Sequence, residues 1–367
     1  MAVVAVLAAS CGNRGADETT TTVPLTTLAP VTTTAAPITT EASTTTSTTT
    51  STTTTTTTLP PVVASPLNGL GVPEESAAVL DRRVIAVKID NHPDARPQSG
   101  LQSADAVYEL IVEGGLTRFI ALFLQSDSSY VGPIRSLRPT DPTLVKPLGA
   151  ALQISGGQSW IKSVARANDV RYLEETSPNT FRIPRGGRAY ERTLFGTTDG
   201  MRERADRLGV PDEPPDPWFG FGEDPTATTS TASTVTLRWT TQTTVVWQWD
   251  PETGTYLRFA GTTPHDWRDA DGTEGRVAFD TLLVISARRY TASPSGSQSG
   301  SSVPALDTVG SGEATAFYGG RAVTGTWSRS SAAEPFQLTA NDGAELILPA
   351  GRLWISVFPS TSTLTWQ

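Results

Sequence analysis

The sequence has few of the residues that carry metal or redox chemistry. Its 367 residues include one cysteine and two histidines. A single cysteine forms no disulfide within the chain and cannot supply the several thiolates of a cysteine-based zinc site. His92 and His265 lie in separate regions, which disfavours a histidine-based zinc site. Nucleotide-binding glycine fingerprints, serine-hydrolase elbows and HExxH motifs are absent, so we expect no metal and no cofactor.

Positive charge is also scarce. The chain has 28 Lys and Arg against 37 Asp and Glu, for a net charge of −9. Because binding to a phosphate backbone requires clustered cations, an acidic chain without a Lys/Arg run is not expected to bind nucleic acid. No apolar stretch reaches the roughly 18 residues of a membrane-spanning helix.

The one cysteine follows a short apolar run, MAVVAVLAASCGN. Small residues before a cysteine resemble a bacterial lipoprotein signal, here residues 1–11, with Cys11 as the lipidated residue. Two features depart from that pattern, because Ala8 stands where leucine is favoured and no Lys or Arg precedes the run. We expect an extracytoplasmic protein held at the outer face of the cell membrane through this lipid alone; an apolar chain end without a function is the alternative.

Threonine dominates the segment after the cysteine. Residues 19–58 are almost entirely Thr with Ser, Ala and Pro. Such a segment has too little apolar surface to offset its ordering entropy, so residues 12–64 are predicted to be a disordered stalk. The alternative is a passive linker of no set length.

Two folded regions are predicted beyond the stalk, giving an α+β chain. Residues 65–210 combine apolar strands with helical patterns and predict an α/β domain with a mixed sheet. A linker rich in Pro, Asp and Thr follows at 211–233. Residues 234–367 alternate short strands with Gly, Asp and Pro, which predicts a mostly antiparallel β domain, sandwich-like or barrel-like.

A strand that ends in polar residues gives the first candidate site. In VKIDNHPDARPQSGL, Asp90, Asn91 and His92 end a β-branched strand, and Arg96 follows shortly after. Pro93 and Pro97 restrict the residues before them to extended conformations, so the loop is stiff. A ligand site and a structural Asx turn are both open interpretations of this loop.

Charged residues flank the next predicted hairpin. Gly114-Gly115 are suited to a two-residue turn, which pairs Ile111 with Arg118. Glu109 and Glu113 then lie diagonal to Arg118 on one face. This cluster is able to bind a sugar or a cation, or to perform glycoside hydrolysis with paired carboxylates. A structural salt-bridge network is the alternative, and the one we favour.

Arginines and glycines supply a further anion-binding pattern. Arg135 and Arg138 in GPIRSLRP can form a fork for carboxylate or phosphate together with Arg96. Gly156-Gly157 expose backbone N–H groups ahead of a predicted helix. The alternative is that these arginines pair with Asp90 or Glu113. His265 lies in a segment, TPHDWRDADGTEG, that we interpret as a polar hairpin turn rather than a calcium loop.

Several of these segments together resemble the YerB-like family of bacterial lipoproteins, whose function is unknown. The resemblance rests on SPLNGL, VKIDNHPDARPQSGLQSADAVYELIVEGGLTRFIALF, GPIRSLRP, TVGSG…AFYGG…GTW and LPAGRLWISVFP, and covers about residues 65–360. It implies a tethered protein with an N-terminal and a C-terminal domain, and no established activity. One departure is RAYERTLFGTT, where Arg192-Thr193 occupy the place of a His-Asn pair.

The sequence therefore predicts a lipid-anchored envelope protein that binds a polar or anionic ligand such as a cell-wall glycan. An envelope glycan hydrolase that uses Asp90 with Glu113 or Glu109 is one alternative. A non-enzymatic adaptor that binds another envelope protein is the other. The candidate ligand-binding residues are Asp90, Asn91, His92, Arg96, Glu113, Arg118, Arg135, Arg138, Gly156 and Gly157.

Overall fold

Strands from both ends of the folded region meet in one large sheet. The computed structural model describes residues 61–176, 178–184, 187–222 and 229–367. The predicted signal with Cys11, most of the predicted stalk and part of the predicted linker lie outside the described residues. All described residues belong to the compact unit Thr58–Gln367. No helix in these ranges is long and apolar enough to cross a membrane.

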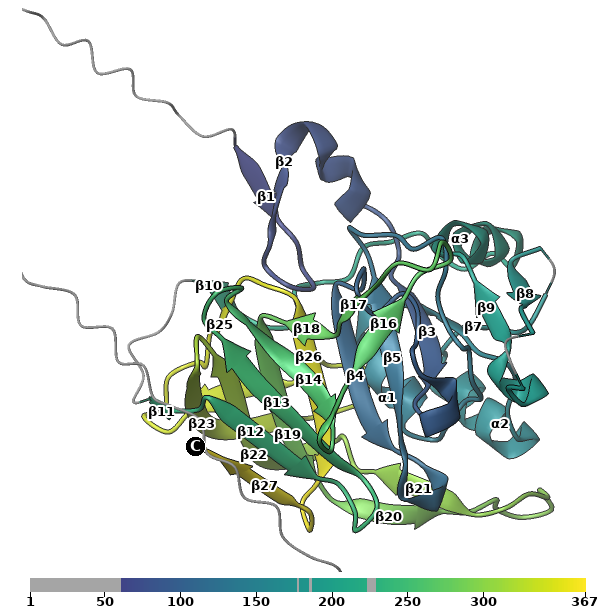
Figure 1. Ribbon diagram of the computed structural model, residues 1–367. Helices are drawn as coiled ribbons and strands as arrows, with labels where there is room; N and C mark the ends of the chain where they lie inside the picture. Colours follow the sequence, from purple (N-terminus) through teal and green to yellow (C-terminus); the bar gives the residue numbers. More distant parts are fainter. Residues whose placement is uncertain (1–60, 177, 185–186, 223–228) are drawn as a thin grey trace, which may run out of the picture. The chain divides into compact units, whose positions relative to one another are not determined.

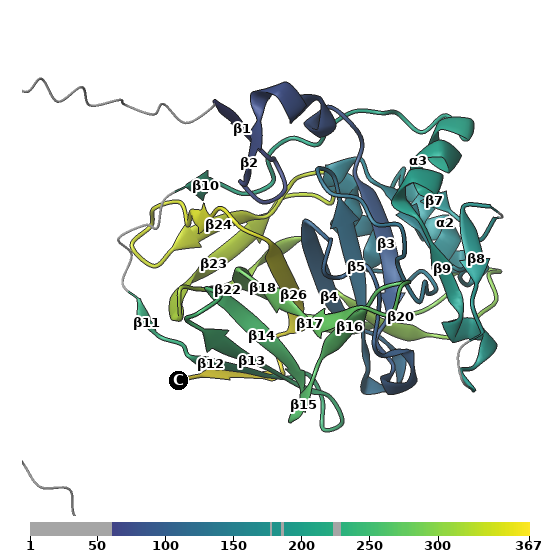
Figure 2. The same ribbon diagram turned by 45° about the horizontal axis from the view of Figure 1, so that its top comes forward.

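The large sheet has 11 strands in the order β11-β23-β22-β19-β26-β4-β5-β3-β6-β7, with β24 on β23 (Figures 1 and 2). Its earlier strands are β3 (Ile85–Asp90), β4 (Ala106–Ile111), β5 (Thr117–Phe123), β6 (Ala151–Gln153) and β7 (Tyr172–Leu173). Its later strands are β11 (Ser230–Thr231), β19 (Thr281–Ala287), β22 (Gly310–Tyr318), β23 (Arg321–Arg329), β24 (Gln337–Ala340) and β26 (Leu353–Pro359).

The late strand β26 lies between an early strand and another late one. It runs parallel to β4 on one side and parallel to β19 on the other. Its seven residues are all buried, which explains why LWISVFP is apolar at every position except Ser356, because a strand covered on both faces does not alternate. The early half of the sheet mixes parallel and antiparallel pairs, and the β19-β22-β23-β24 half is antiparallel.

A second sheet packs against one face of the first. It has six strands in the order β15-β14-β13-β12-β27, with β18 on β14. Its strands are β12 (Thr234–Arg238), β13 (Thr244–Asp250), β14 (Thr255–Ala260), β15 (Thr263–Pro264), β18 (Ala278–Phe279) and β27 (Thr363–Trp366). Trp247 of β13 contacts Trp354 of β26 with ring centroids 5.1 Å apart. The predicted α+β class, with a mixed sheet followed by mostly antiparallel strands, is confirmed, and both sheets stay open in the described residues.

The helices α1 (Asp141–Val145), α2 (Ser159–Ala167) and α3 (Thr198–Arg207) lie beyond the early strands, on the side away from β12–β14 (Figure 1). The described residues also form 3-10 turns, which are η1 (Glu74–Leu80), η2 (Pro93–Ala95), η3 (Glu113–Gly115), η4 (Lys146–Leu148) and η5 (Tyr190–Arg192). The N-cap of α3 is Thr197, whose hydroxyl accepts a hydrogen bond from the Gly200 N–H at 3.0 Å, a role for which threonine is favoured.

Short two-stranded pairings complete the fold. They are β1 (Val62–Ala64) with β2 (Gly71–Pro73), β8 (Thr180–Arg182) with β9 (Leu194–Gly196), β10 (Phe221–Gly222) with β25 (Leu348–Pro349), β16 (Asp266–Arg268) with β17 (Glu274–Arg276), and β20 (Arg289–Ala292) with β21 (Val303–Leu306). Trp218, inside the predicted linker, is buried, and its indole N–H donates to the Leu67 carbonyl at 2.8 Å. The domain boundaries themselves stay a prediction.

The predicted two-residue turn at Gly114-Gly115 is wrong. Ile111 pairs with Thr117, and Arg118 pairs with Leu110. Residues 112–116 form a five-residue connection through η3, in which the left-handed backbone of Gly114 (φ 66°) suits glycine. Because side chains alternate along a strand, this one-residue change of register moves Arg118 to the opposite face from Glu109.

Because β26 joins early and late strands, we expect the two halves of the large sheet to unfold together. Ile355 is fully buried and pairs with Tyr108 and Leu283. Ile355→Ala should cost about 2–5 kcal/mol through the cavity it leaves. Hydrogen exchange measured by mass spectrometry should show this loss in peptides from β3–β5 and from β19–β22 alike.

The matched control is Val309→Ala, whose wild-type side chain is 46% exposed, and it should change the free energy of unfolding by less than about 0.5 kcal/mol. Destabilisation confined to the late strands would contradict a shared unfolding unit.

Candidate functional site

The polar side chains at the end of β3 point to opposite faces of the large sheet. Asp90 is the last residue of β3 and is 3% exposed. Asn91 is 1% exposed and points to the opposite face. His92 and Arg96 have extended backbones, with ψ of 145° and 151°, as the following prolines predict. The imidazole Nδ1 of His92 accepts a hydrogen bond from the Asp94 N–H at 3.2 Å and so caps η2.

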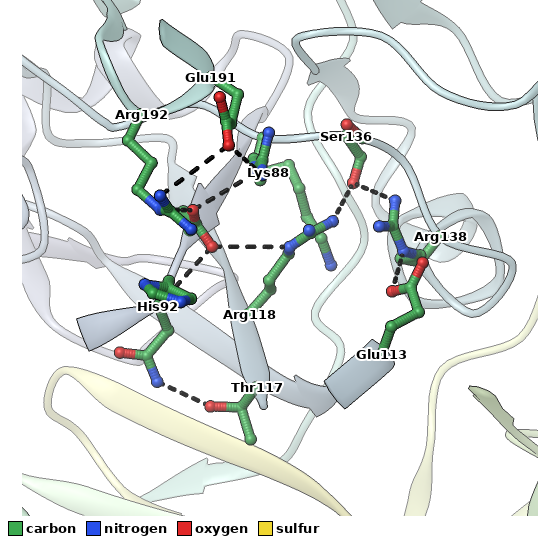
Figure 3. A network of polar contacts seen from close by, with 12 residues as sticks. Lys88, His92, Glu113, Thr117, Arg118, Ser136, Arg138, Glu191 and Arg192 are labelled. Atoms are coloured by element: carbon green, nitrogen blue, oxygen red, sulfur yellow. Dashed lines mark hydrogen bonds and ion pairs between the residues drawn. The ribbon is translucent and has the colours of Figure 1, made fainter. Parts of the chain in front are cut away.

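Three arginines converge on the Asp90 carboxylate. The guanidinium Nε atoms of Arg118, Arg135 and Arg192 lie 3.8, 3.3 and 3.6 Å from its oxygens. Arg118 belongs to β5 and Arg192 to η5, and both are labelled in Figure 3, whereas Arg135 lies in the connection between β5 and α1. We call Asp90 with these three arginines the arginine cluster.

The backbone explains how the cluster forms. Asp90 and Arg118 are direct partners across β3 and β5. The segment before Arg135 lies along the end of β3, where the Arg135 N–H donates to the Lys88 carbonyl at 2.8 Å. Arg192 is the last residue of η5, and its guanidinium also lies 3.7 Å from Asp94.

The charges in the arginine cluster do not satisfy one another. Charge-assisted N–H···O bonds are usually about 2.7–2.9 Å long, and all three arginine contacts with Asp90 are longer. Asp90 Oδ2 and the three Nε atoms are buried and have no hydrogen-bond partner among the described residues. Burial, together with the positive charge of Arg138, lowers the pKa of Arg118 to about 10. The cluster is therefore cationic at its centre and has unused donor capacity.

Glu191 lies at the rim of the arginine cluster. Its carboxylate is 46% exposed and 3.9 Å from a guanidinium nitrogen of both Arg135 and Arg192. A carboxylate thus already occupies the outer edge of the two arginines without a close hydrogen bond to either.

Arg138 and Glu113 form a separate pair beside the arginine cluster. Arg138 Nε donates to Glu113 Oε2 at 2.6 Å. Burial raises the pKa of Glu113, but the hydrogen bond and charge of Arg138 outweigh burial and lower it overall. A carboxyl group with a lowered pKa is a poor general acid at neutral pH.

A fully buried ion pair supports the segment that carries these arginines. Lys88 Nζ donates to Asp141 Oδ1 at 2.6 Å, and neither side chain is exposed. Burial lowers the pKa of Lys88 to about 8, against the opposing effect of Asp141. The second oxygen of Asp141 accepts from the Arg138 N–H at 2.7 Å, so this pair fixes the start of α1 against β3.

The opposite face of the sheet carries a buried polar chain centred on Glu109. Its carboxylate accepts from Arg258 and from the Thr117 hydroxyl, both at 2.7 Å, and from the Trp354 indole at 3.1 Å. Glu109 and Arg258 are both fully buried. Such a pair is stable only when hydrogen bonds satisfy the carboxylate, and here three donors do so.

The same polar chain continues to the loop after β3. Asn91 donates to the Thr117 hydroxyl at 2.7 Å. Gln98 donates to the Asn91 side chain at 3.1 Å and to the Asp90 carbonyl at 3.0 Å. Arg96 Nε also donates to Asn91 Oδ1, at 3.1 Å. Asn91 and Arg96 are therefore engaged with protein groups behind the loop, while Asp90 faces the arginines.

His265 closes this chain from the second sheet. Its Nδ1 accepts from Arg258, and its Nε2 donates to Gln98 Oε1 at 2.7 Å. Because arginine only donates, the imidazole is neutral with its proton on Nε2. Burial, and then the charge of Arg258, lower the pKa of His265 well below its usual value.

The other predicted residues lie near but not in the arginine cluster. The Gly156 carbonyl accepts from the Leu137 N–H at 2.9 Å, and Gly157 lies against the Leu137 side chain. Both glycines thus support the segment between Arg135 and Arg138. The Asp269–Thr273 segment is a polar turn between β16 and β17, in which Asp271 accepts from the Thr273 N–H at 2.8 Å. Within the described ranges, no cluster of three or more His, Cys, Asp or Glu could hold a metal.

Some residues of these networks were not predicted from the sequence as site residues. They are Glu191, Arg192, Gln98, Arg258 and His265. Arg192 did carry a signal, since it stands where the family resemblance implies a histidine. Gln98, Arg258 and His265 have partners 149 or 167 residues away, which local sequence patterns do not indicate.

Comparisons with known proteins agree with this architecture. Two family models match, described as the N-terminal domain, at residues 70–211, and the C-terminal domain, at residues 235–355, of a protein of unknown function (DUF3048). The protein named "Putative lipoprotein YerB" from Bacillus subtilis (strain 168) is 48% identical over 80 residues, which are 22% of this chain and 23% of that relative. The chain therefore aligns with about a quarter of that relative's length.

A solved structure shares the fold. A crystal structure of the YerB protein from Bacillus subtilis matches with a TM-score of 0.68 and 23% identity, and the match covers 83% of this chain and 99% of that one.

The neutral state of His265 predicts a pH dependence of stability. Below about pH 6.5, His265 binds a proton in the unfolded state but stays neutral in the folded state. The free energy of unfolding therefore falls as pH falls. From pH 7.5 to 5.5 His265 should account for about 1.4 kcal/mol of that loss. Urea unfolding at several pH values checks this, with His265→Gln expected to reduce the slope. If the free energy of unfolding changed with pH equally in wild type and in His265→Gln, His265 would not control the pH dependence.

Proposed function

This chain belongs to the DUF3048 family of proteins of unknown function, and we propose that it is an extracytoplasmic lipoprotein whose arginine cluster binds an anionic group. The ligand class is a carboxylate or phosphate carried by a cell-wall glycan. The observation that carries the proposal is the convergence of Arg118, Arg135 and Arg192 on a single carboxylate that does not saturate them.

The geometry suits an anion better than a cation or an apolar ligand. Arginine offers planar, forked donors that match the two oxygens of carboxylate and phosphate. Asp90 holds the three guanidiniums together against their mutual repulsion. The outer nitrogens of Arg135 and Arg192 remain available, because their contacts to Glu191 are as long as 3.9 Å.

Glu191 marks where the ligand would bind. Its exposed carboxylate lies beside Arg135 and Arg192 and has the same chemistry as the proposed ligand. A phosphate has more charge and more acceptor oxygens than this carboxylate, so it would displace Glu191 rather than add to it.

The buried polar chain gives the cluster its rigidity. Asn91 and Gln98 fix the backbone on either side of the Asp90 loop from behind. A binding site that is held before the ligand arrives loses less entropy on binding. The proposal therefore needs no rearrangement of the loop apart from the Glu191 side chain.

The proposed location rests on sequence and relatives. The name of the Bacillus subtilis relative is that of a lipoprotein, and Cys11 follows an apolar run in this chain. A lipid at Cys11 and the Thr-rich segment after it would place the folded unit among cell-wall polymers.

The contacts support binding more than glycoside hydrolysis. Hydrolysis needs one carboxyl group with a raised pKa near a second carboxylate. The pKa of Glu113 is lowered, and Glu109 is fully buried, with both oxygens engaged. Neither is suited to donate a proton to a sugar.

The proposal predicts binding of inorganic phosphate and of a poly(glycerol phosphate) fragment to the full chain in isothermal titration calorimetry. Arg135→Gln and Arg192→Gln should each weaken binding about tenfold to 100-fold, because each removes a charge-assisted contact. Added salt should weaken it further.

Arg289→Gln is the matched control, since Arg289 is exposed on β20 and has no ion pair in the described residues; its affinity should equal that of wild type. Unchanged affinity in both cluster variants, with melting temperatures equal to wild type, would contradict the proposal.

A further inference from the structure

A concave surface lies away from the arginine cluster. It is a groove of about 660 Å³ between the face of β19, β22 and β23 and the edge strand β27. Pockets that hold small ligands usually measure about 300–1,000 Å³. The groove is thus large enough for several sugar rings or a short peptide, and its lining decides between them.

Hydroxyl groups cover the floor of the groove. Thr315 and Thr324 are cross-strand partners on β22 and β23, and Glu313 and Thr326 are partners one step along the same face. Ser286 of β19 adds a further hydroxyl. Neighbouring strands are about 4.8 Å apart, so the polar side chains on the floor are regularly spaced.

The wall of the groove is aromatic and apolar. Trp366 and Leu364 of β27 and Phe358 at the end of β26 line it. The Trp366 ring packs edge-on against Phe317, with centroids 5.5 Å apart, and its indole N–H donates to Ser230 at 3.1 Å. These contacts fix the orientation of the indole beside the hydroxyl floor.

Most polar groups on the floor have unused hydrogen-bonding capacity. Glu313, Thr315 and Thr326 make no side-chain hydrogen bond or ion pair within the described residues, although Thr315 is only 7% exposed. Thr324 is engaged, since its hydroxyl accepts from Asn341 at 2.8 Å. A hydroxyl that faces a groove without a protein partner is a group to which a ligand can hydrogen-bond.

The lining distinguishes among ligand classes. It contains no lysine or arginine, so a phosphate or carboxylate would meet Glu313 without a compensating charge. Hydroxyls, one carboxylate, one amide and an adjacent indole match a ligand that carries many hydroxyls and apolar C–H faces. We propose that this groove binds a neutral oligosaccharide, at a site separate from the arginine cluster.

The test is isothermal titration calorimetry of the full chain with chitotetraose and maltohexaose, two uncharged oligosaccharides. At least one should bind with a Kd below about 1 mM. Thr315→Val keeps the shape of the side chain and removes its hydroxyl, and Glu313→Gln removes the charge. Each should weaken binding about tenfold, as expected for the loss of one hydrogen bond to the ligand.

Two control variants distinguish binding in the groove from sugar binding elsewhere on the chain. Thr236→Val makes the same substitution on β12, outside the groove, and should leave sugar affinity unchanged. Arg135→Gln should also leave it unchanged, so failure of the arginine cluster to bind anions would not affect this result.

Failure of both sugars to bind would overturn the proposal. So would sugar binding that is equal in wild type and in the Thr315 and Glu313 variants. Binding of an unstructured threonine-rich peptide in place of the sugars would assign the groove instead to strand addition at the β27 edge.

Discussion

The buried carboxylate of Glu109 is the constraint on which the rest of the structure depends. A charge at the centre of a sheet is costly unless it is paired and fully hydrogen-bonded. Its donors come from β5, β14 and β26. Glu109 can therefore be buried only when the early strands, the second sheet and the late strand β26 are assembled around it.

This requirement connects the interior to the candidate site. The polar chain passes from Glu109 through Thr117 and Asn91 to Gln98, which is also held by His265. Asp90 lies between the two faces of the sheet, with its backbone held by the buried chain and its carboxylate among the arginines. The side chains of Asp90 and Asn91 reach different networks because consecutive residues of a strand point to opposite faces of the sheet.

Local patterns in the sequence predicted much of the fold and part of the site. Apolar strands such as β3 and β26 depend on neighbouring residues and were predictable. The side-chain partners of Arg118 were not, because they depend on a one-residue difference in the register between β4 and β5. The contacts of Arg192 with Asp90 and of Arg258 with Glu109 join residues about a hundred or more positions apart, which only the tertiary fold brings together.

The central claim is that a preformed arginine cluster, held from behind by the buried polar chain, receives an anion. A crystal structure of the full chain grown with inorganic phosphate tests it most directly. The account predicts phosphate oxygens within hydrogen-bond distance of Arg135 and Arg192, the Glu191 side chain turned away, and the Asp90–Gln98 backbone unchanged. An arginine cluster that holds no phosphate, with Glu191 still between the two arginines, would contradict it.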